Sequence, residues 1–288
     1  MSKQTSYPKY LVDGVEIDAI SIDAATRYIV QVASEPSTHA CYVAKPYVEF
    51  FAAREDPRVR GLLNQAELCL PDGVSLNWAT TFLYGTHHHW WDVVATGAQL
   101  VFRPKAAYAF LPDRFAGPNV TWPLLERCEQ ANLRVLLMGS PKHGSIIETA
   151  NVIRRHLPNI TIVGALKGEI GGLRGAELLE GLRAGISIET VAEEIRSHKP
   201  DVILVGMGFP LQETLMAQLQ GLLSHGVMIG EGGTFDYQSF GGQAARAPQF
   251  MQKLGIEWLW RLIREPSRIR RQIEIPRFIW RIYRSSHR

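Results

Sequence analysis

Short apolar segments alternate with amphipathic segments of helical period along most of the chain. The apolar segments are rich in Val, Ile and Leu without strict alternation, which is typical of strands covered on both faces. They lie at residues 39–44, 67–71, 134–139, 159–165, 201–208 and 226–233. The amphipathic segments lie at residues 46–65, 140–157, 187–199 and 211–224. This order predicts an α/β fold, a mostly parallel Rossmann-like sheet with helices on both faces.

Composition excludes several other classes of protein. The chain is 46% hydrophobic and 20% charged, and it contains no apolar run near the length of a membrane-spanning helix. Its first ten residues contain no apolar stretch, so we expect no secretory signal. The three cysteines form no C-x-x-C pair, so we expect neither a disulfide framework nor a cysteine zinc site, and a reducing compartment fits.

Charge is concentrated at one end of the chain. Residues 251–288 contain ten Lys or Arg and three acidic residues, a formal charge of +7, so that residues 1–250 carry −4 of the total of +3. A basic terminal segment on an acidic body indicates an anionic partner, which is a phospholipid surface, a nucleic acid or a phosphorylated substrate.

Glycines follow the predicted strands at the edge where α/β proteins bind ligands. Gly139, Gly206, Gly208 and Gly232 would let a ligand approach the backbone, and their N–H groups suit a phosphate. No stretch matches G-x-G-x-x-G or the phosphate-binding P-loop. A nucleotide-binding oxidoreductase is therefore disfavoured, whereas a nucleoside diphosphate could still use these loops.

Residues 82–113 interrupt the alternation. They are rich in aromatic side chains and contain Gly and Pro, so we expect an excursion from the sheet, either a lid or a membrane-facing loop. The run His87–His89 lies within this segment. Adjacent histidines do not converge easily on one ion, so we interpret them as part of a solvated loop in preference to a metal site.

The basic end of the chain is compatible with short helices. Trp258, Trp260, Trp280 and Tyr283 are interleaved with arginines, and prolines at 266 and 276 are expected to break the segment. Aromatic residues with Arg on an amphipathic segment favour interfacial membrane association. A helix pair packed on the core with a solvated basic face is the alternative, and nucleic-acid binding is disfavoured because no recognition motif is present. We therefore divide the chain into an α/β catalytic core (1–245) and a helical membrane-associating appendage (246–288).

Several motifs resemble those of a known family. They are the opening segment 11–29, ELCLPDGVSLNWA (67–79), RFAGPNVTWPLLERCEQANLRVLLMGS (114–140), KPDVILVGMGFPLQE (199–213) and GGTFDYQSFGGQAARAPQFMQKLGIEWLWRLIREPSRIRRQ (232–272). From about Val12 onwards, the chain resembles the WecG/TagA/CpsF family of bacterial glycosyltransferases, glycosyltransferase family 26.

The resemblance implies an inverting enzyme that moves a sugar from a nucleotide-sugar to a polyprenyl-diphosphate-linked saccharide. The nucleotide-sugar of such enzymes is often UDP-linked. It implies cell-surface polysaccharide or exopolysaccharide synthesis, no required metal or other cofactor, and peripheral attachment to the cytoplasmic face of the bacterial plasma membrane. A homo-oligomer is a further partner that it suggests. A GDP-mannose-type donor and a non-catalytic, membrane-bound scaffold with the same fold are the alternatives.

Two residues carry the expected chemistry. Asp72 matches the base that the family is proposed to use on the acceptor hydroxyl, and the alternative is an N-cap of the next helix. Arg114 matches the arginine of the family's Arg-x-x-Gly segment and would stabilise the departing diphosphate, with a surface ion pair as the alternative. Arg261, Arg268 and Arg271 match basic positions that the family is thought to fold over the active site.

Other residues are candidates for substrate binding. Gln212 and Glu213 begin a helix after a glycine-rich strand end and could contact the base, ribose or sugar, although Glu213 could instead stabilise the first helical turn. Asp236 is either a ribose or sugar contact or a buried cap, and Arg246 is expected to anchor the tail to the core. Lys45 stands where the family usually has Asn, and it could meet a carboxylate or phosphate of the substrate.

Overall fold

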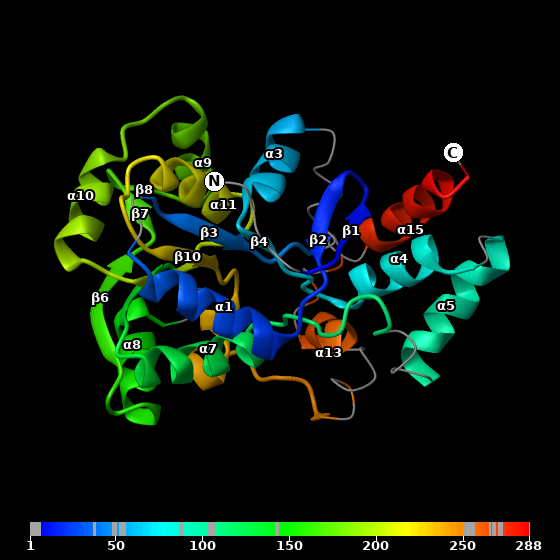
Figure 1. Cartoon of the computed structure of the whole chain (residues 1–288), viewed down its shortest axis with the longest axis horizontal. Helices are drawn as coiled ribbons and strands as arrows, with labels where there is room; N and C mark the ends of the chain where they lie inside the picture. Colours follow the sequence, from blue (N-terminus) through cyan, green and yellow to red (C-terminus); the bar gives the residue numbers. More distant parts are fainter. Residues whose placement is uncertain are drawn as a thin grey trace.

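The computed structural model describes residues 7–36, 39–47, 51, 56–86, 89–102, 108–141, 144–249, 251, 257–264, 266, 269 and 273–287. Its centre is a six-stranded sheet in the order β4-β3-β10-β9-β5-β6, in which all five neighbouring pairs of strands are parallel (Figure 1). The strands are β3 (Cys41–Ala44), β4 (Leu68–Cys69), β5 (Arg134–Gly139), β6 (Thr161–Lys167), β9 (Val202–Gly206) and β10 (Val227–Gly230). The predicted α/β sheet is confirmed, with each strand inside or beside its apolar segment.

Helices cover both faces of this sheet because alternate strand residues point to opposite sides. Val227 and Ile229 of β10 join one core cluster, and Met228 between them joins the other. The first cluster is covered by α1 (Ile22–Ser34), α7 (Pro118–Gln130) and α8 (Ile146–His156). The second is covered by α3 (Pro57–Gln65), α4 (Val74–Tyr84), α9 (Gly175–Arg183), α10 (Glu189–His198), α11 (Leu211–Gln220) and α15 (Glu274–Ser285).

Two small antiparallel pairs lie outside the central sheet. Strands β1 (Lys9–Val12) and β2 (Val15–Asp18) form a hairpin, and β7 (Glu169–Ile170) pairs with β8 (Leu173–Arg174). Both turn residues of the hairpin, Asp13 and Gly14, have positive φ (52° and 83°), as a tight two-residue turn requires. The opening segment 11–29, which resembles the strand and helix at the start of the family's sequences, thus contains part of a hairpin followed by α1.

Much of the excursion at 82–113 is helical. Helix α4 continues to Tyr84, and α5 (Trp90–Phe102) follows it. The two helices contact each other at the end of the molecule that also carries α15 (Figure 1). Residues 90–102 therefore form a helix of at least three turns and not the loop that we expected.

The basic end of the chain contributes α13 (Glu257–Arg264) and α15. Pro276 lies in the first turn of α15, where its missing N–H costs no helical hydrogen bond. Phe278 and Ile282 of α15 are fully buried in the core cluster that also contains α4. Among the described residues, no helix has the length and apolarity needed to cross a bilayer.

The strand order predicts where a ligand would bind at the edge of the sheet. From β5 the chain goes on to β6 on one side, whereas from β9 it goes on to β10 on the other. At such a reversal the loops leave in opposite directions, and ligands of α/β proteins bind outside the carboxyl ends of the two strands. Gly139 and Gly206 end these two strands side by side.

Candidate active site

Backbone hydrogen bonds bring three predicted segments together at the carboxyl edge of the sheet. The Asp72 N–H donates to the Pro46 carbonyl (3.1 Å), which follows Lys45 at the end of β3. The Phe115 N–H donates to the Pro71 carbonyl (2.8 Å). The backbone segments that carry Asp72 and Arg114 therefore run next to each other, although about forty residues separate them in the sequence. Both residues are partly exposed.

Asp72 does not occupy the cap position of the helix that follows it. The N-cap of α4 is Gly73, which makes no side-chain capping bond. Gly73 has φ of +99°, and a Cβ there would lie 3.0 Å from the Tyr47 ring, so the turn after Asp72 is tight and favours glycine. The N-cap alternative for Asp72 is wrong, and the base assignment remains.

Lys45 is engaged inside the protein. Its Nζ lies 2.8 Å from Glu231 Oε2, and the two side chains are 4% and 0% exposed. The Thr121 hydroxyl donates to the same oxygen at 2.7 Å. Glu231 Oε1 has no hydrogen-bond partner among the described residues. The carboxylate that Lys45 meets is thus the chain's own, supplied by the loop after β10.

Gln212 links the two glycine loops. Its Oε1 accepts from the Gly208 N–H (3.2 Å) after β9 and from the Gly232 N–H (2.9 Å) after β10. Its Nε2 donates to Glu213 Oε1 at 2.8 Å. Gln212 is 4% exposed, so its carboxamide fixes the spacing of the two loops from beneath. Two of the four glycine amides that we proposed for a phosphate are therefore bonded to this side chain.

Glu213 is fully buried at the start of α11. Burial raises the pKa of its carboxyl to about 7, although the Gln212 hydrogen bond and the Lys45 charge oppose the shift. Its Oε2 has no hydrogen-bond partner among the described residues. Glu213 therefore lies below the edge of the sheet, where it supports Gln212.

The four predicted glycines fall into two groups. A Cβ at Gly139 would lie 2.7 Å from the Gly206 carbonyl, and one at Gly206 would lie 2.4 Å from the Phe235 ring. Close packing within the protein therefore accounts for both. A Cβ at Gly208 or Gly232 would meet nothing within 4 Å, and both have positive φ (76° and 56°). These two loops have the open space beside the backbone that a ligand needs.

The remaining predicted residues surround this edge or lie outside the described residues. Asp236 is partly exposed in the turn that follows Gly232. Arg246 donates to Asn119 Oδ1 at 2.8 Å, so it ties the start of the tail to α7. Arg261 lies in α13, where only the backbone is described, and Arg268 and Arg271 lie outside the described residues.

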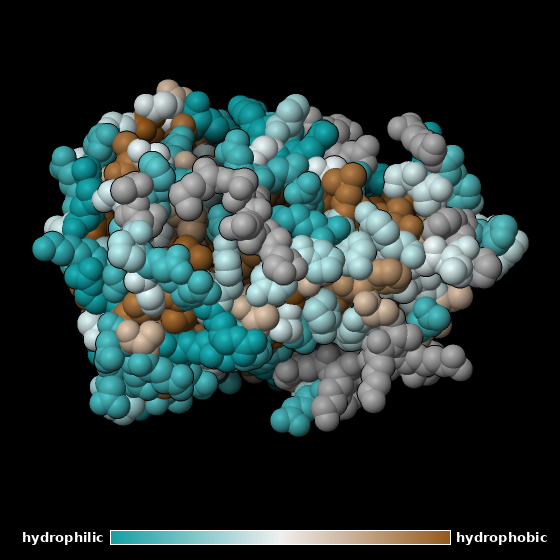
Figure 2. Space-filling model, in the orientation of Figure 1, coloured by the Kyte–Doolittle hydropathy of each residue, from teal (hydrophilic) through white to brown (hydrophobic). Residues whose placement is uncertain are grey.

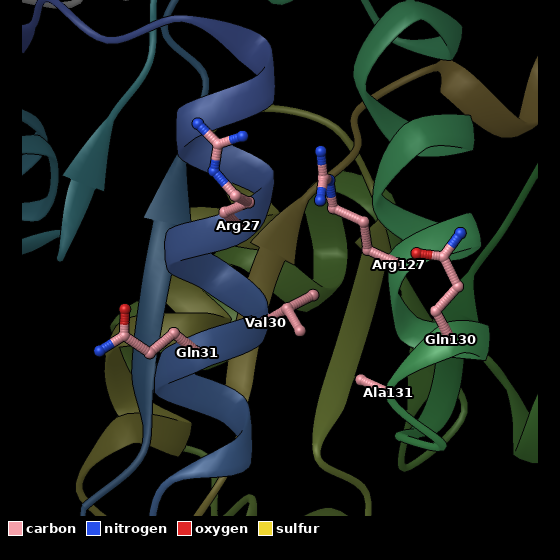
Figure 3. A pocket seen from close by; sticks show the side chains of 6 residues that line it. All are labelled: Arg27, Val30, Gln31, Arg127, Gln130 and Ala131. Carbon is pink, nitrogen blue, oxygen red and sulfur yellow. The ribbon is translucent and has the colours of Figure 1, made fainter.

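No metal centre is found in the part of the chain that the structure describes. No three His, Cys, Asp or Glu side chains gather there in a group that could hold an ion. His87 and His88 lie outside that part. A groove of about 430 Å³ lies between α1 and α7 (Figure 3). It is lined by Arg27 and Arg127, which both pair with Asp23, and it contains none of the predicted site residues.

Sequence reasoning missed Glu231 and Thr121. The β3–β10 register could have revealed Glu231, because Val43 pairs with Ile229 and the next residues on the same faces are Lys45 and Glu231. Opposite charges two residues beyond a registered pair of buried strands indicate an ion pair. Thr121 carried no such signal, because its approach depends on how α7 packs.

Comparison with known proteins shows the family to which the chain belongs. The family model described as "Glycosyl transferase WecG/TagA/CpsF family" matches residues 10–90 and 86–288. A Bacillus spizizenii protein named N-acetylglucosaminyldiphosphoundecaprenol N-acetyl-beta-D-mannosaminyltransferase is 30% identical over 229 residues, which cover 80% of this chain and 73% of that protein. The family-model match includes the segments that carry Asp72, Arg114 and Gln212. The chain belongs to the WecG/TagA/CpsF family and is a glycosyltransferase.

Proposed function

We propose that the chain transfers a sugar, with inversion, from a UDP-linked donor to a saccharide carried on a polyprenyl diphosphate, in cell-surface polysaccharide synthesis. The name of the Bacillus spizizenii relative supports a lipid-linked acceptor. The observation that carries the proposal is the position of Asp72, a partly exposed residue at the carboxyl edge of the sheet whose backbone segment is hydrogen-bonded to the segment of Arg114.

In this proposal, Asp72 takes the proton from the acceptor hydroxyl as its oxygen attacks the anomeric carbon from the face opposite the diphosphate. The bond between that carbon and the diphosphate oxygen breaks, and the nucleoside diphosphate leaves with the electron pair. Arg114 neutralises part of the charge that develops on it, and Arg261, Arg268 and Arg271 contribute further positive charge. Transfer then needs no metal ion, so excess EDTA should leave the rate unchanged.

We propose that the reaction takes place at the cytoplasmic face of the plasma membrane. A nucleotide-sugar is soluble and a polyprenyl-linked acceptor is not, so the enzyme must meet both at the membrane surface. The basic segment 251–288, with a charge of +7, supports peripheral attachment to anionic lipid. We also propose that the chain associates with further copies of itself as a homo-oligomer.

A donor screen tests the proposal. The full chain is incubated with UDP-N-acetylmannosamine, UDP-N-acetylglucosamine, UDP-glucose or GDP-mannose and a short-chain polyprenyl-diphosphate N-acetylglucosamine. Free nucleoside diphosphate and an extended lipid with inverted anomeric configuration are the expected products with one UDP-sugar. Turnover with GDP-mannose alone would overturn the UDP assignment. Absence of both turnover and nucleotide binding would indicate the scaffold.

A further inference from the structure

Helix α5 presents an uncharged face to solvent. Trp90, Trp91 and Val94 are 67%, 52% and 68% exposed. Between residues 90 and 100, the exposed residues of the helix follow the spacing i, i+1, i+4, i+5, i+8, i+9 and are Trp90, Trp91, Val94, Ala95, Ala98 and Gln99. The outer face of a helix in a soluble protein normally carries charged side chains. The outer face of α5 carries none.

The opposite face of α5 is fixed to the core, so the apolar face cannot turn inward. The Trp78 indole N–H donates to the Val93 carbonyl at 3.2 Å. Val93 and Leu100 pack against the main core cluster, and Thr96 is buried. The single charged residue of the helix, Asp92, accepts from the His89 N–H at 2.8 Å and so caps the first turn.

Helix α15 contacts α5 and adds positive charge at the same end of the molecule. Its buried face is held by Phe278 and Ile282, and its outer face carries Arg277, Trp280 and Arg284 at the spacing i, i+3, i+7. Trp280 is 59% exposed. Figure 2 shows brown surface where α15 and the β1–β2 hairpin lie in Figure 1. Apolar and cationic side chains thus share one end of the protein.

We propose that the outer faces of α5 and α15 form a membrane-docking surface for anionic phospholipid, in which α5 enters the boundary between headgroups and acyl chains. Tryptophan side chains are favoured at that depth because the indole is apolar with one polar N–H. Arg277 and Arg284 bind lipid phosphates above it. The Arg277–Glu274 pair is a surface pair that leaves other guanidinium donors free to do so. This inference rests on the proposed function only for the need to reach a lipid-linked acceptor.

Charge favours a bilayer over a second copy of the chain as the occupant. In a symmetric dimer, the same patch is used on both copies, so the arginine-bearing faces of the two α15 helices would approach each other. Like charges opposed across an interface cost free energy, whereas an anionic membrane surface attracts both arginines.

Vesicle co-sedimentation of the full chain tests the surface. The variant Trp90→Gln/Trp91→Gln/Val94→Gln should partition at least about tenfold less into vesicles of phosphatidylcholine with phosphatidylglycerol. Arg277→Gln/Arg284→Gln should lose binding only where phosphatidylglycerol is present. Ile147→Gln, which removes an exposed apolar side chain (55%) from α8, is the matched control and should bind like the wild type.

The outcomes separate this surface from the proposed reaction. The docking surface is overturned if the triple variant binds vesicles as well as the wild type does. It is also overturned if the wild type is a dimer and the triple variant is a monomer that still binds vesicles equally well. Turnover of a water-soluble, short-chain acceptor should be the same in the triple variant and the wild type. If the triple variant loses vesicle binding and the wild type turns over no donor, the docking surface is supported and the proposed reaction is overturned.

Discussion

Lys45 Nζ and Glu231 Oε2 lie 2.8 Å apart at the ends of two neighbouring strands, with both side chains withdrawn from solvent. Thr121 supports the same carboxylate from α7. A buried pair of this kind is costly to break, because the remaining partner keeps its charge in a medium that solvates it poorly. The pair therefore couples β3, β10 and α7 directly beside the candidate active site.

A double-mutant cycle measures this coupling. Lys45→Met and Glu231→Leu should each lower the free energy of unfolding by about 3–5 kcal/mol, because each leaves one buried charge unpaired. The double variant should lose much less than the sum of the two, since it buries no charge. Urea unfolding of all four proteins gives the interaction energy. Strictly additive losses would show that the two side chains do not interact.

Asp72→Asn should reduce kcat by about 10²–10⁴-fold while the KM for the nucleotide-sugar changes little, because the amide cannot accept the acceptor's proton. Steady-state kinetics with the donor found in the screen checks this. Asp113→Asn is the matched control: its carboxylate accepts from the Ile22 N–H at 2.8 Å, a bond that an amide oxygen can also make. An active, folded Asp72→Asn enzyme would remove Asp72 from the role of base.

Gln212→Leu should weaken donor binding and lower stability together. The change removes the acceptor for the Gly208 and Gly232 N–H groups, and each donor left unsatisfied in a buried setting costs on the order of 1–3 kcal/mol. We expect the donor KM to rise more than kcat falls, since the loops move and the base does not. Gln218→Leu on the same helix, which loses one bond to the Leu182 carbonyl, is the control and should leave the KM unchanged.

Glu213 should make stability depend on pH. Its pKa is raised to about 7 in the folded protein, so the folded state retains a proton that the unfolded state releases near its ordinary value. Stability contributed by this group therefore falls as the pH rises from about 4.5 to about 7, and it is constant above that range.

Glu213→Gln tests the assignment, because the amide does not titrate. The variant should gain stability relative to the wild type as the pH rises through this window, and thermal unfolding at pH 4 to 8 follows the difference. An equal difference in unfolding free energy at both ends of the range would show that the pKa of Glu213 is the same in the folded and unfolded states.

Sequence patterns predicted the central sheet well because each of its strands is buried on both faces. Segments such as 201–208 are continuous apolar runs between polar helices, and that contrast is visible without the structure. The hairpin was harder, since β1 and β2 are four residues each and only the Asp13–Gly14 pair signals the turn. Helix α5 was missed because its residues are apolar nearly all round, so no helical period stands out.

For the candidate site, the sequence placed Asp72 and the glycine loops at one edge, because parallel strands end together, whereas Arg114 was indicated only by the family resemblance. It could not distinguish packing from binding. Gly206 and Gly208 look alike in sequence, yet a Phe235 ring fills the space beside the first and none of the described atoms approaches the second. Likewise, the orientation of the Gln212 carboxamide depends on two loops that meet only in the folded protein.

Phe278 closes the apolar pocket formed by Phe51 and Trp78, with ring centroids 4.9 and 6.4 Å apart. During synthesis, Phe51 and Trp78 emerge roughly 200 residues before Phe278, because the chain is made from its amino end. The nascent chain therefore carries an uncovered aromatic surface until α15 has been made.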